Sequence, residues 1–124
     1  MKPSASIYEP LDDVFKSVRL IEVLPPSSDR QICIRMRQAQ APVQYRCLSY
    51  TWGDASQESE ILVNDQSVRV RYNLYTFLQT AQRRYTEQLL WIDALCINQN
   101  DNIEKNHQVQ RMGEIFSGAE AVLI

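Results

Sequence analysis

The sequence is poor in the residues that build covalent or metal-linked scaffolds. Its 124 residues include only three cysteines, Cys33, Cys47 and Cys96, and one histidine. The odd number of cysteines and the absence of C-x-x-C spacing argue against a disulfide framework and against a zinc site. We therefore expect reduced thiols and no metal ligands.

Glycine-rich loops and long apolar runs are also missing. Gly53 is the sole glycine near the short strand expected at 45–50, which excludes the phosphate-binding loops of Rossmann and P-loop proteins. No run approaches the ~20 apolar residues that span a bilayer, and residues 1–13 contain no apolar signal segment. We therefore expect a cytoplasmic protein with no membrane partner.

Charge of neither sign dominates the chain. The 13 basic and 15 acidic residues are scattered and leave a net charge of −2. This balance provides no electrostatic footprint for nucleic acid, so we expect no nucleic-acid partner. A chain of this length is sufficient for one hydrophobic core but not for two.

The first half of the sequence predicts short strands. Residues 18–26 and 31–37 flank a Pro- and Ser-rich turn and indicate an antiparallel pair. A short strand follows at 45–50 and enters a loop at Thr51 to Asp54. Residues 60–70 predict a β-hairpin that turns at Asn64 to Ser67.

Two helices are predicted in the second half. The first is capped by Asn73 and has an apolar face at helical spacing up to Tyr85. The second begins near Asp101, with Glu104 at capping-box spacing, and ends at Gly118. Its expected apolar stripe is Val109, Met112, Ile115, Phe116 and Ala119, and its expected solvated face is Glu104, Lys105, Arg111 and Glu114.

The stretch LLWIDALCINQND, residues 89–101, combines an apolar run with a polar loop. Leu89 to Ile92 predict a strand that is covered on both faces. Loops that leave the carboxyl ends of such strands form the ligand crevice of open α/β sheets. Asp93, Asn98 and Gln99 therefore either bind a ligand or cap the backbone at the strand end.

Several motifs, in this order and spacing, resemble the heterokaryon incompatibility (HET) domain of filamentous fungi. They are YRCLSYTWGD (45–54), NLYTFLQTAQ (73–82), LLWIDALCINQND (89–101) and EKNHQVQRMGEIFSGAEAVLI (104–124). The resemblance covers residues 15–124, which we interpret as a single truncated HET domain, and leaves residues 1–14 as an N-terminal tail.

HET domains are in turn similar to Toll/interleukin-1 receptor (TIR) domains, which implies an α/β fold with a flavodoxin-like, mainly parallel sheet. Under this similarity Cys47 to Tyr50 form the first and central strand, Trp91 to Asp93 the second and Val122 to Ile124 the third. The sheet is truncated after this third strand and carries the N-terminal antiparallel pair and an inserted hairpin. The loop from Ala94 to Asn102 corresponds to the TIR loop that flanks the nucleotide pocket and mediates self-association.

The resemblance implies a role in heterokaryon incompatibility, that is, in self/non-self recognition and programmed cell death in fungal innate immunity. We expect the chain to act by association with itself or with another protein. The candidate ligand-binding or loop residues are Ser49, Tyr50, Trp52, Gly53, Asp54, Asp93, Cys96, Asn98 and Gln99.

The first alternative is an enzyme, because enzymatic TIR domains cleave NAD and amide side chains suit ribose hydroxyls or a carboxamide. Glu104 and Glu114 do not match the position of the TIR catalytic glutamate, so we assign no catalytic residue and expect no activity from the isolated chain. Cys96 with His107 lacks an orienting third group. The second alternative is an inactive gene fragment.

Overall fold

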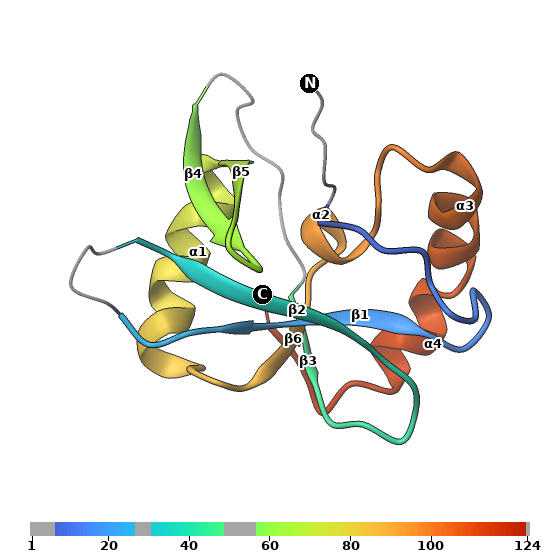
Figure 1. The fold of residues 1–124 in the computed structure, drawn as a ribbon. Helices are drawn as coiled ribbons and strands as arrows, with labels where there is room; N and C mark the ends of the chain where they lie inside the picture. The colour runs from blue at the N-terminus through green and yellow to red at the C-terminus, as the bar shows by residue number, and fades with distance from the viewer. Residues whose placement is uncertain (1–6, 27–30, 49–56, 124) are drawn as a thin grey trace.

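The computed structural model describes residues 7–26, 31–48 and 57–123. The strands of these ranges are β1 (Val18–Val23), β2 (Cys33–Ala39), β3 (Arg46–Leu48), β4 (Glu58–Val63), β5 (Gln66–Arg71), β6 (Leu89–Trp91) and β7 (Ala121–Leu123). The helices are α1 (Tyr72–Arg84), α2 (Asp93–Cys96), α3 (Asn102–Gln110) and α4 (Met112–Ser117). The described strands form one sheet in the order β5-β4-β2-β1-β6-β3-β7 (Figure 1).

The sheet is mixed, so the prediction of a mainly parallel sheet is wrong. Adjacent strands run antiparallel at β1–β2, β1–β6 and β4–β5, and parallel at β2–β4, β3–β6 and β3–β7. The reason is that the predicted N-terminal pair joins the main sheet, with β1 lying against β6 in the opposite direction. Ile21 faces Leu90 across this junction, and both side chains are fully buried.

Three strands at one end of the sheet form a parallel unit in the order β6-β3-β7. Cys47 of β3 is in register with Trp91 on one side and with Val122 on the other. The first of these strands in sequence therefore lies between the second and the third. Helices connect the strands, as parallel connections require: α1 precedes β6, and α3 and α4 precede β7.

The predicted hairpin is confirmed as β4 and β5, with a turn shorter than expected. Asn64 and Asp65 have φ values of 51° and 68°, which is the backbone of a two-residue hairpin turn of type I′. The Asn64 side chain accepts from the Met36 amide at 2.9 Å and donates to the Met36 carbonyl at 3.1 Å. These bonds attach the turn to β2.

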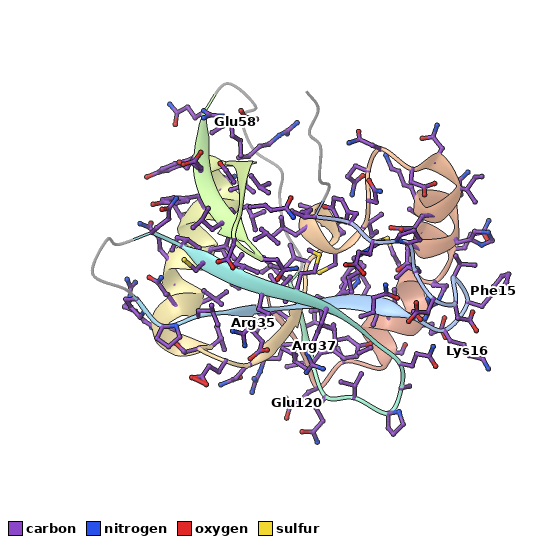
Figure 2. The ribbon with its side chains drawn as sticks, viewed as in Figure 1. Phe15, Lys16, Arg35, Arg37, Glu58 and Glu120 are labelled. Atoms are coloured by element: carbon purple, nitrogen blue, oxygen red, sulfur yellow. The ribbon has the colours of Figure 1, made fainter. Side chains whose placement is uncertain are left out.

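β2 alternates buried and exposed side chains, as a half-buried strand does. Ile34 and Met36 are buried, whereas Arg35 and Arg37 between and after them are exposed. Figure 2 shows both arginines projecting from the same side of β2. The strand thus contributes one face to the core and one to the surface.

The first predicted helix is present, but its cap is not Asn73. Helix α1 begins at Tyr72, its N-cap is Arg71, and Asn73 lies inside the first turn. The physical reason is that β5 runs directly into the helix and leaves no turn residue in front of it. Leu74, Leu78 and Ala81 form the buried face of α1.

The second predicted helix is divided at Arg111 into α3 and α4. Asp101 is the N-cap and accepts from the amides of Ile103 and Glu104, as predicted, and Gly118 is the C-cap of α4. Val109 was expected in the apolar stripe but is 51% exposed. The division accounts for this, because residues on the two sides of Arg111 do not share one helical face.

Candidate functional site

The candidate site lies where β6 leaves the sheet. Leu90, Trp91 and Ile92 are fully buried, which confirms a strand covered on both faces. The one-turn helix α2 starts at Asp93 and is followed by a loop at 97–101 that enters α3. This loop stands at the carboxyl end of a parallel strand, the position where α/β sheets bind ligands.

Asp93 is half-buried, and its Oδ1 atom has no hydrogen-bond partner in the described part of the chain. Burial raises the pKa of this carboxyl, and the hydrogen bond from the Ala94 amide opposes the rise. The indole Nε1 of Trp91 is likewise buried without a partner among the residues that the structure describes. Because Ile92 between them is extended, Trp91 and Asp93 project to the same side of the chain. A donor and an acceptor are therefore left unpaired at the strand end.

Cys96 is buried and has the properties of a packing residue. Its Sγ lies 3.4 Å from the Ile92 amide, which donates to it. Burial raises the pKa of the thiol to about 12, so the thiolate that a nucleophile requires is not formed near neutral pH. The histidine considered as its base, His107, makes an edge contact with Phe15 at 5.2 Å between ring centroids. This environment does not support the hypothesis that Cys96 is a nucleophile with His107 as its base.

Asn98 and Gln99 have structural partners within the loop. The Asn98 side chain accepts from the Asn100 amide at 3.1 Å, and the Gln99 side chain donates to the Asp93 carbonyl at 3.0 Å. Both are the local side-chain-to-backbone bonds that shape turns. They fit the capping interpretation of these amides.

A buried ion pair that was not predicted from the sequence fixes this loop. Arg19 of β1 and Glu104 of α3 are joined through both guanidinium nitrogens at 2.5 and 2.7 Å, with side chains 2% and 5% exposed. Glu104 also accepts from the Asn98 amide at 2.8 Å. The prediction that Glu104 and Arg111 lie on a solvated helix face is therefore wrong.

Arg111, the second residue wrongly expected on the solvated helix face, is also largely buried. Its side chain is 13% exposed and donates to the carbonyls of Val14 and Ser17 at 3.2 and 2.8 Å. The one sequence signal for a buried pair was a charged residue, Arg19, inside the apolar run of β1. Nothing near it in the sequence identified the partner, because Glu104 is 85 residues away.

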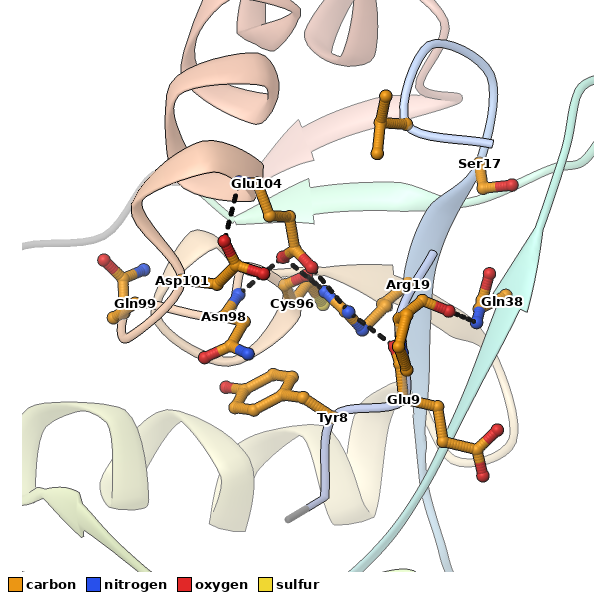
Figure 3. Close-up of polar contacts among 12 residues, drawn as sticks. Tyr8, Glu9, Ser17, Arg19, Gln38, Cys96, Asn98, Gln99, Asp101 and Glu104 are labelled. Atoms are coloured by element: carbon orange, nitrogen blue, oxygen red, sulfur yellow. Dashed lines mark hydrogen bonds and ion pairs between the residues drawn. The ribbon is translucent and has the colours of Figure 1, made fainter. Parts of the chain in front are cut away.

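The N-terminal segment takes part in the same set of contacts (Figure 3). Arg19 donates to the Glu9 carbonyl at 2.7 Å and lies over the Tyr8 ring at 5.0 Å. The Tyr8 hydroxyl donates to the Leu95 carbonyl of α2 at 2.7 Å, and burial raises its pKa. Residues 7–9, placed in the tail by the sequence analysis, thus contact both β1 and α2.

Two hollows border Ile7 of the N-terminal segment, and a third lies beside Phe15 and Val18. A cavity of about 380 Å³ is bordered by β5, α2 and Asn100, and one of about 350 Å³ by β1 and β2. A cavity of about 670 Å³ lies beside α4, at the opposite end of β3. Within the described ranges no three His, Cys, Asp or Glu side chains converge as a metal site requires.

Five of the predicted site residues lie outside the described ranges, so their role stays a prediction. They are Ser49, Tyr50, Trp52, Gly53 and Asp54. No helix among residues 7–26, 31–48 and 57–123 has both the length and the apolar character needed to cross a membrane.

Comparison with known proteins identifies the family. Residues 45–124 match the family model described as heterokaryon incompatibility protein (HET). The chain is 37% identical over 130 residues to heterokaryon incompatibility protein 6, OR allele, of Neurospora crassa, and the match covers 92% of this chain and 19% of that protein. The chain thus spans about a fifth of the length of that relative, and no solved structure matches it. The chain belongs to the heterokaryon incompatibility (HET) family.

Proposed function

We propose that this chain is part of a HET domain that acts in fungal heterokaryon incompatibility, in self/non-self recognition that leads to programmed cell death, and that it acts by protein association. The observation that carries the proposal is the family match over 45–124, together with the similarity to a Neurospora protein named for incompatibility. The matched residues include β3, β6 and β7 and the loop after β6.

The strand order supports a TIR-like core within this mixed sheet. In the parallel unit β6-β3-β7 the first strand lies in the middle, which is the arrangement that the TIR resemblance implies for these strands. The loop after β6 is held by Asp101 at the start of α3 and by the Glu104 contact with the Asn98 amide. A loop with such anchors presents a defined surface.

An exposed apolar strip beside this loop supports association. It consists of Ile103, His107 and Phe15, and we call it the α3 strip. Ile103 is 72% exposed and Phe15 is 67% exposed, and Phe15 rests edge-on against His107, one helical turn beyond Ile103. Large apolar side chains held exposed by folded structure are common in protein contacts.

Sedimentation velocity over a range of protein concentrations tests the proposal. We expect the wild-type chain to form dimers or larger species, and Ile103→Glu to weaken this association at least tenfold because it places a charge in the strip. Val109→Glu is the matched control, since Val109 is also exposed on α3 but points about 120° away from Ile103. The expression of each variant within the complete protein in a filamentous fungus then measures incompatibility and cell death. A wild-type chain that stays monomeric, or equal association of all three chains, contradicts the proposal.

The second candidate function is NAD binding, and the unpaired atoms at the end of β6 favour it. Trp91 Nε1 offers a donor and Asp93 Oδ1 an acceptor, both buried, at the crevice position. Glu104 is occupied by Arg19, so it offers no free carboxylate for catalysis. We therefore propose binding rather than cleavage by these residues.

Nuclear magnetic resonance of the indole N–H groups tests this candidate. Titration with NAD is expected to shift the Trp91 indole signal, which Trp91→Phe identifies, and Asp93→Asn is expected to reduce the shift. An unchanged Trp91 signal in a folded sample at millimolar NAD contradicts the candidate.

A further inference from the structure

The segment of residues 7–12, which we call the N-terminal strap, lies across a trough between β2, β5 and α2. Figure 1 shows the blue segment that begins at residue 7 lying beside α2 before the chain reaches β1. Ile7 borders both the 380 Å³ cavity on the β5 side and the 350 Å³ cavity on the β2 side. The strap therefore lies between two surface hollows and leaves both of them open.

The trough contacts the strap mainly through its backbone. Arg19 donates to the Glu9 carbonyl at 2.7 Å. The Gln38 side chain donates to the Pro10 carbonyl at 2.8 Å and accepts from the Asp12 amide at 2.8 Å. Arg19 and Gln38 are cross-strand partners on β1 and β2 and therefore act side by side. These bonds recognise an extended chain without regard to its side chains.

Tyr8 supplies the side-chain recognition. Its ring lies 5.0 Å from the Arg19 guanidinium carbon, and its hydroxyl donates to the Leu95 carbonyl at 2.7 Å. Glu9 and Pro10, by contrast, are exposed. An occupant of this trough therefore needs backbone carbonyl and amide groups placed like those of residues 9–12, with a tyrosine just before them.

We propose that this trough is an exchangeable peptide groove, filled by the strap of the same chain in the monomer and by the strap of a second copy when two chains associate. The inference rests on the proposed function, because it names one contact through which association occurs. Every copy carries both the groove and its occupant, and exchange of an identical segment between protomers is a low-cost route to a dimer.

Peptide binding to the full chain tests the groove. Tyr8→Ala weakens the strap in its own groove, so this variant is expected to bind a fluorescent peptide of residues 7–14, IYEPLDDV, at least tenfold more tightly than the wild-type chain does. A peptide with alanine at the tyrosine is expected to bind about tenfold more weakly, as the loss of one hydrogen bond and an aromatic contact implies. A peptide with glutamine in place of glutamate is the control and is expected to bind equally, because only the Glu9 carbonyl is bonded.

Absence of peptide binding to Tyr8→Ala, in a sample that unfolds cooperatively like the wild type, overturns the groove. If Tyr8→Ala does not fold, Tyr8→Phe removes only the hydroxyl, and peptide binding no tighter than that of the wild type overturns it equally. This readout does not depend on self-association, so its failure leaves the α3 strip and the proposed function standing.

A mixing experiment tests the exchange between copies. Both variants carry Ile103→Glu, which weakens association through the α3 strip. Tyr8→Ala then supplies an open groove and Gln38→Ala supplies a strap released from its own groove, so an equimolar mixture is expected to form a one-to-one complex that neither variant forms alone. Peptide binding without this complex overturns the exchange. If the complex forms but an excess of the IYEPLDDV peptide does not dissociate it, the two chains do not meet through the groove, and the proposal is overturned.

Discussion

Two carboxylates at the two ends of the same loop have opposite environments. Glu104, at the α3 end, receives two bonds from Arg19 and one from the Asn98 amide, and its side chain is 5% exposed. Asp93, at the β6 end, is half-buried, and its Oδ1 atom has no hydrogen-bond partner among residues 7–26, 31–48 and 57–123. The comparison teaches that burial alone does not distinguish the two carboxylates: Glu104 is satisfied by its partners and holds the loop, whereas Asp93 keeps an acceptor atom that the described residues leave unused.

Removal of Glu104 is expected to have the largest effect. Glu104→Ala leaves Arg19 buried without its counter-charge, and the loss of one partner from a buried pair costs about 3–5 kcal/mol of unfolding free energy. Glu114→Ala is the matched control on α4, since Glu114 is 65% exposed and its pair with Arg111 contributes about 0–1 kcal/mol. Urea denaturation of both variants measures the difference.

A double variant sharpens this result. Replacement of the pair by Arg19→Met with Glu104→Leu removes both charges, and such replacements are often nearly neutral or stabilising. Recovery of stability would assign the cost of Glu104→Ala to the stranded arginine. A double variant as unstable as the single one would instead show that the bonds to Asn98 and Glu9 are what the fold requires.

The loss of the helix cap is expected to have an intermediate effect. Asp101 accepts from the amides of Ile103 and Glu104 at 3.1 Å each. Asp101→Ala removes these bonds and is expected to lower the unfolding free energy by about 1 kcal/mol. Asp101→Asn keeps an acceptor oxygen and serves as the control. Equal losses in thermal denaturation would contradict the capping role.

The smallest effect is expected at Asp93, and it depends on pH. Burial raises the pKa of Asp93 above its ordinary value of 3.8, so the folded state holds this proton more tightly than the unfolded state. The contribution of the protonated Asp93 carboxyl to the free energy of unfolding is fully present below pH 3.8. It is lost as the pH rises through the pKa of Asp93 in the folded state. The stability of Asp93→Asn relative to wild type is therefore expected to increase over that interval and then to level off. A pH-independent difference contradicts the raised pKa.

The local elements were predictable from residue patterns. Residues 31–37 predicted β2, the turn residues Asn64 to Ser67 between two apolar runs predicted the hairpin, and Asp101 predicted the start of α3. These signals act over a few residues, which is the range over which propensity, turn chemistry and capping operate. The predicted cap at Asn73 was wrong because the first residue of α1 depends on where β5 ends. The end of β5 is set by its pairing with β4, which residue patterns near Asn73 do not show.

The long-range contacts were not predictable in the same way. Arg19 meets Glu104 across 85 residues, and Tyr8 meets Leu95 across 87. A single sequence shows an arginine in an apolar strand and a glutamate on a helix. No pattern of neighbouring residues indicates that the two side chains form a pair. The capping-box spacing located the start of α3 correctly, but it gave no sign that the Glu104 carboxylate pairs with Arg19 of β1.

By itself the sequence determined the family, most element types and the turn and cap residues, because these depend on motifs and on neighbours along the chain. The tertiary structure decided the mixed direction of the sheet, the burial of Glu104 and Arg111, and the position of the N-terminal strap. These depend on which distant groups satisfy each other once water is excluded, since a buried charge or amide is stable only where a partner meets it.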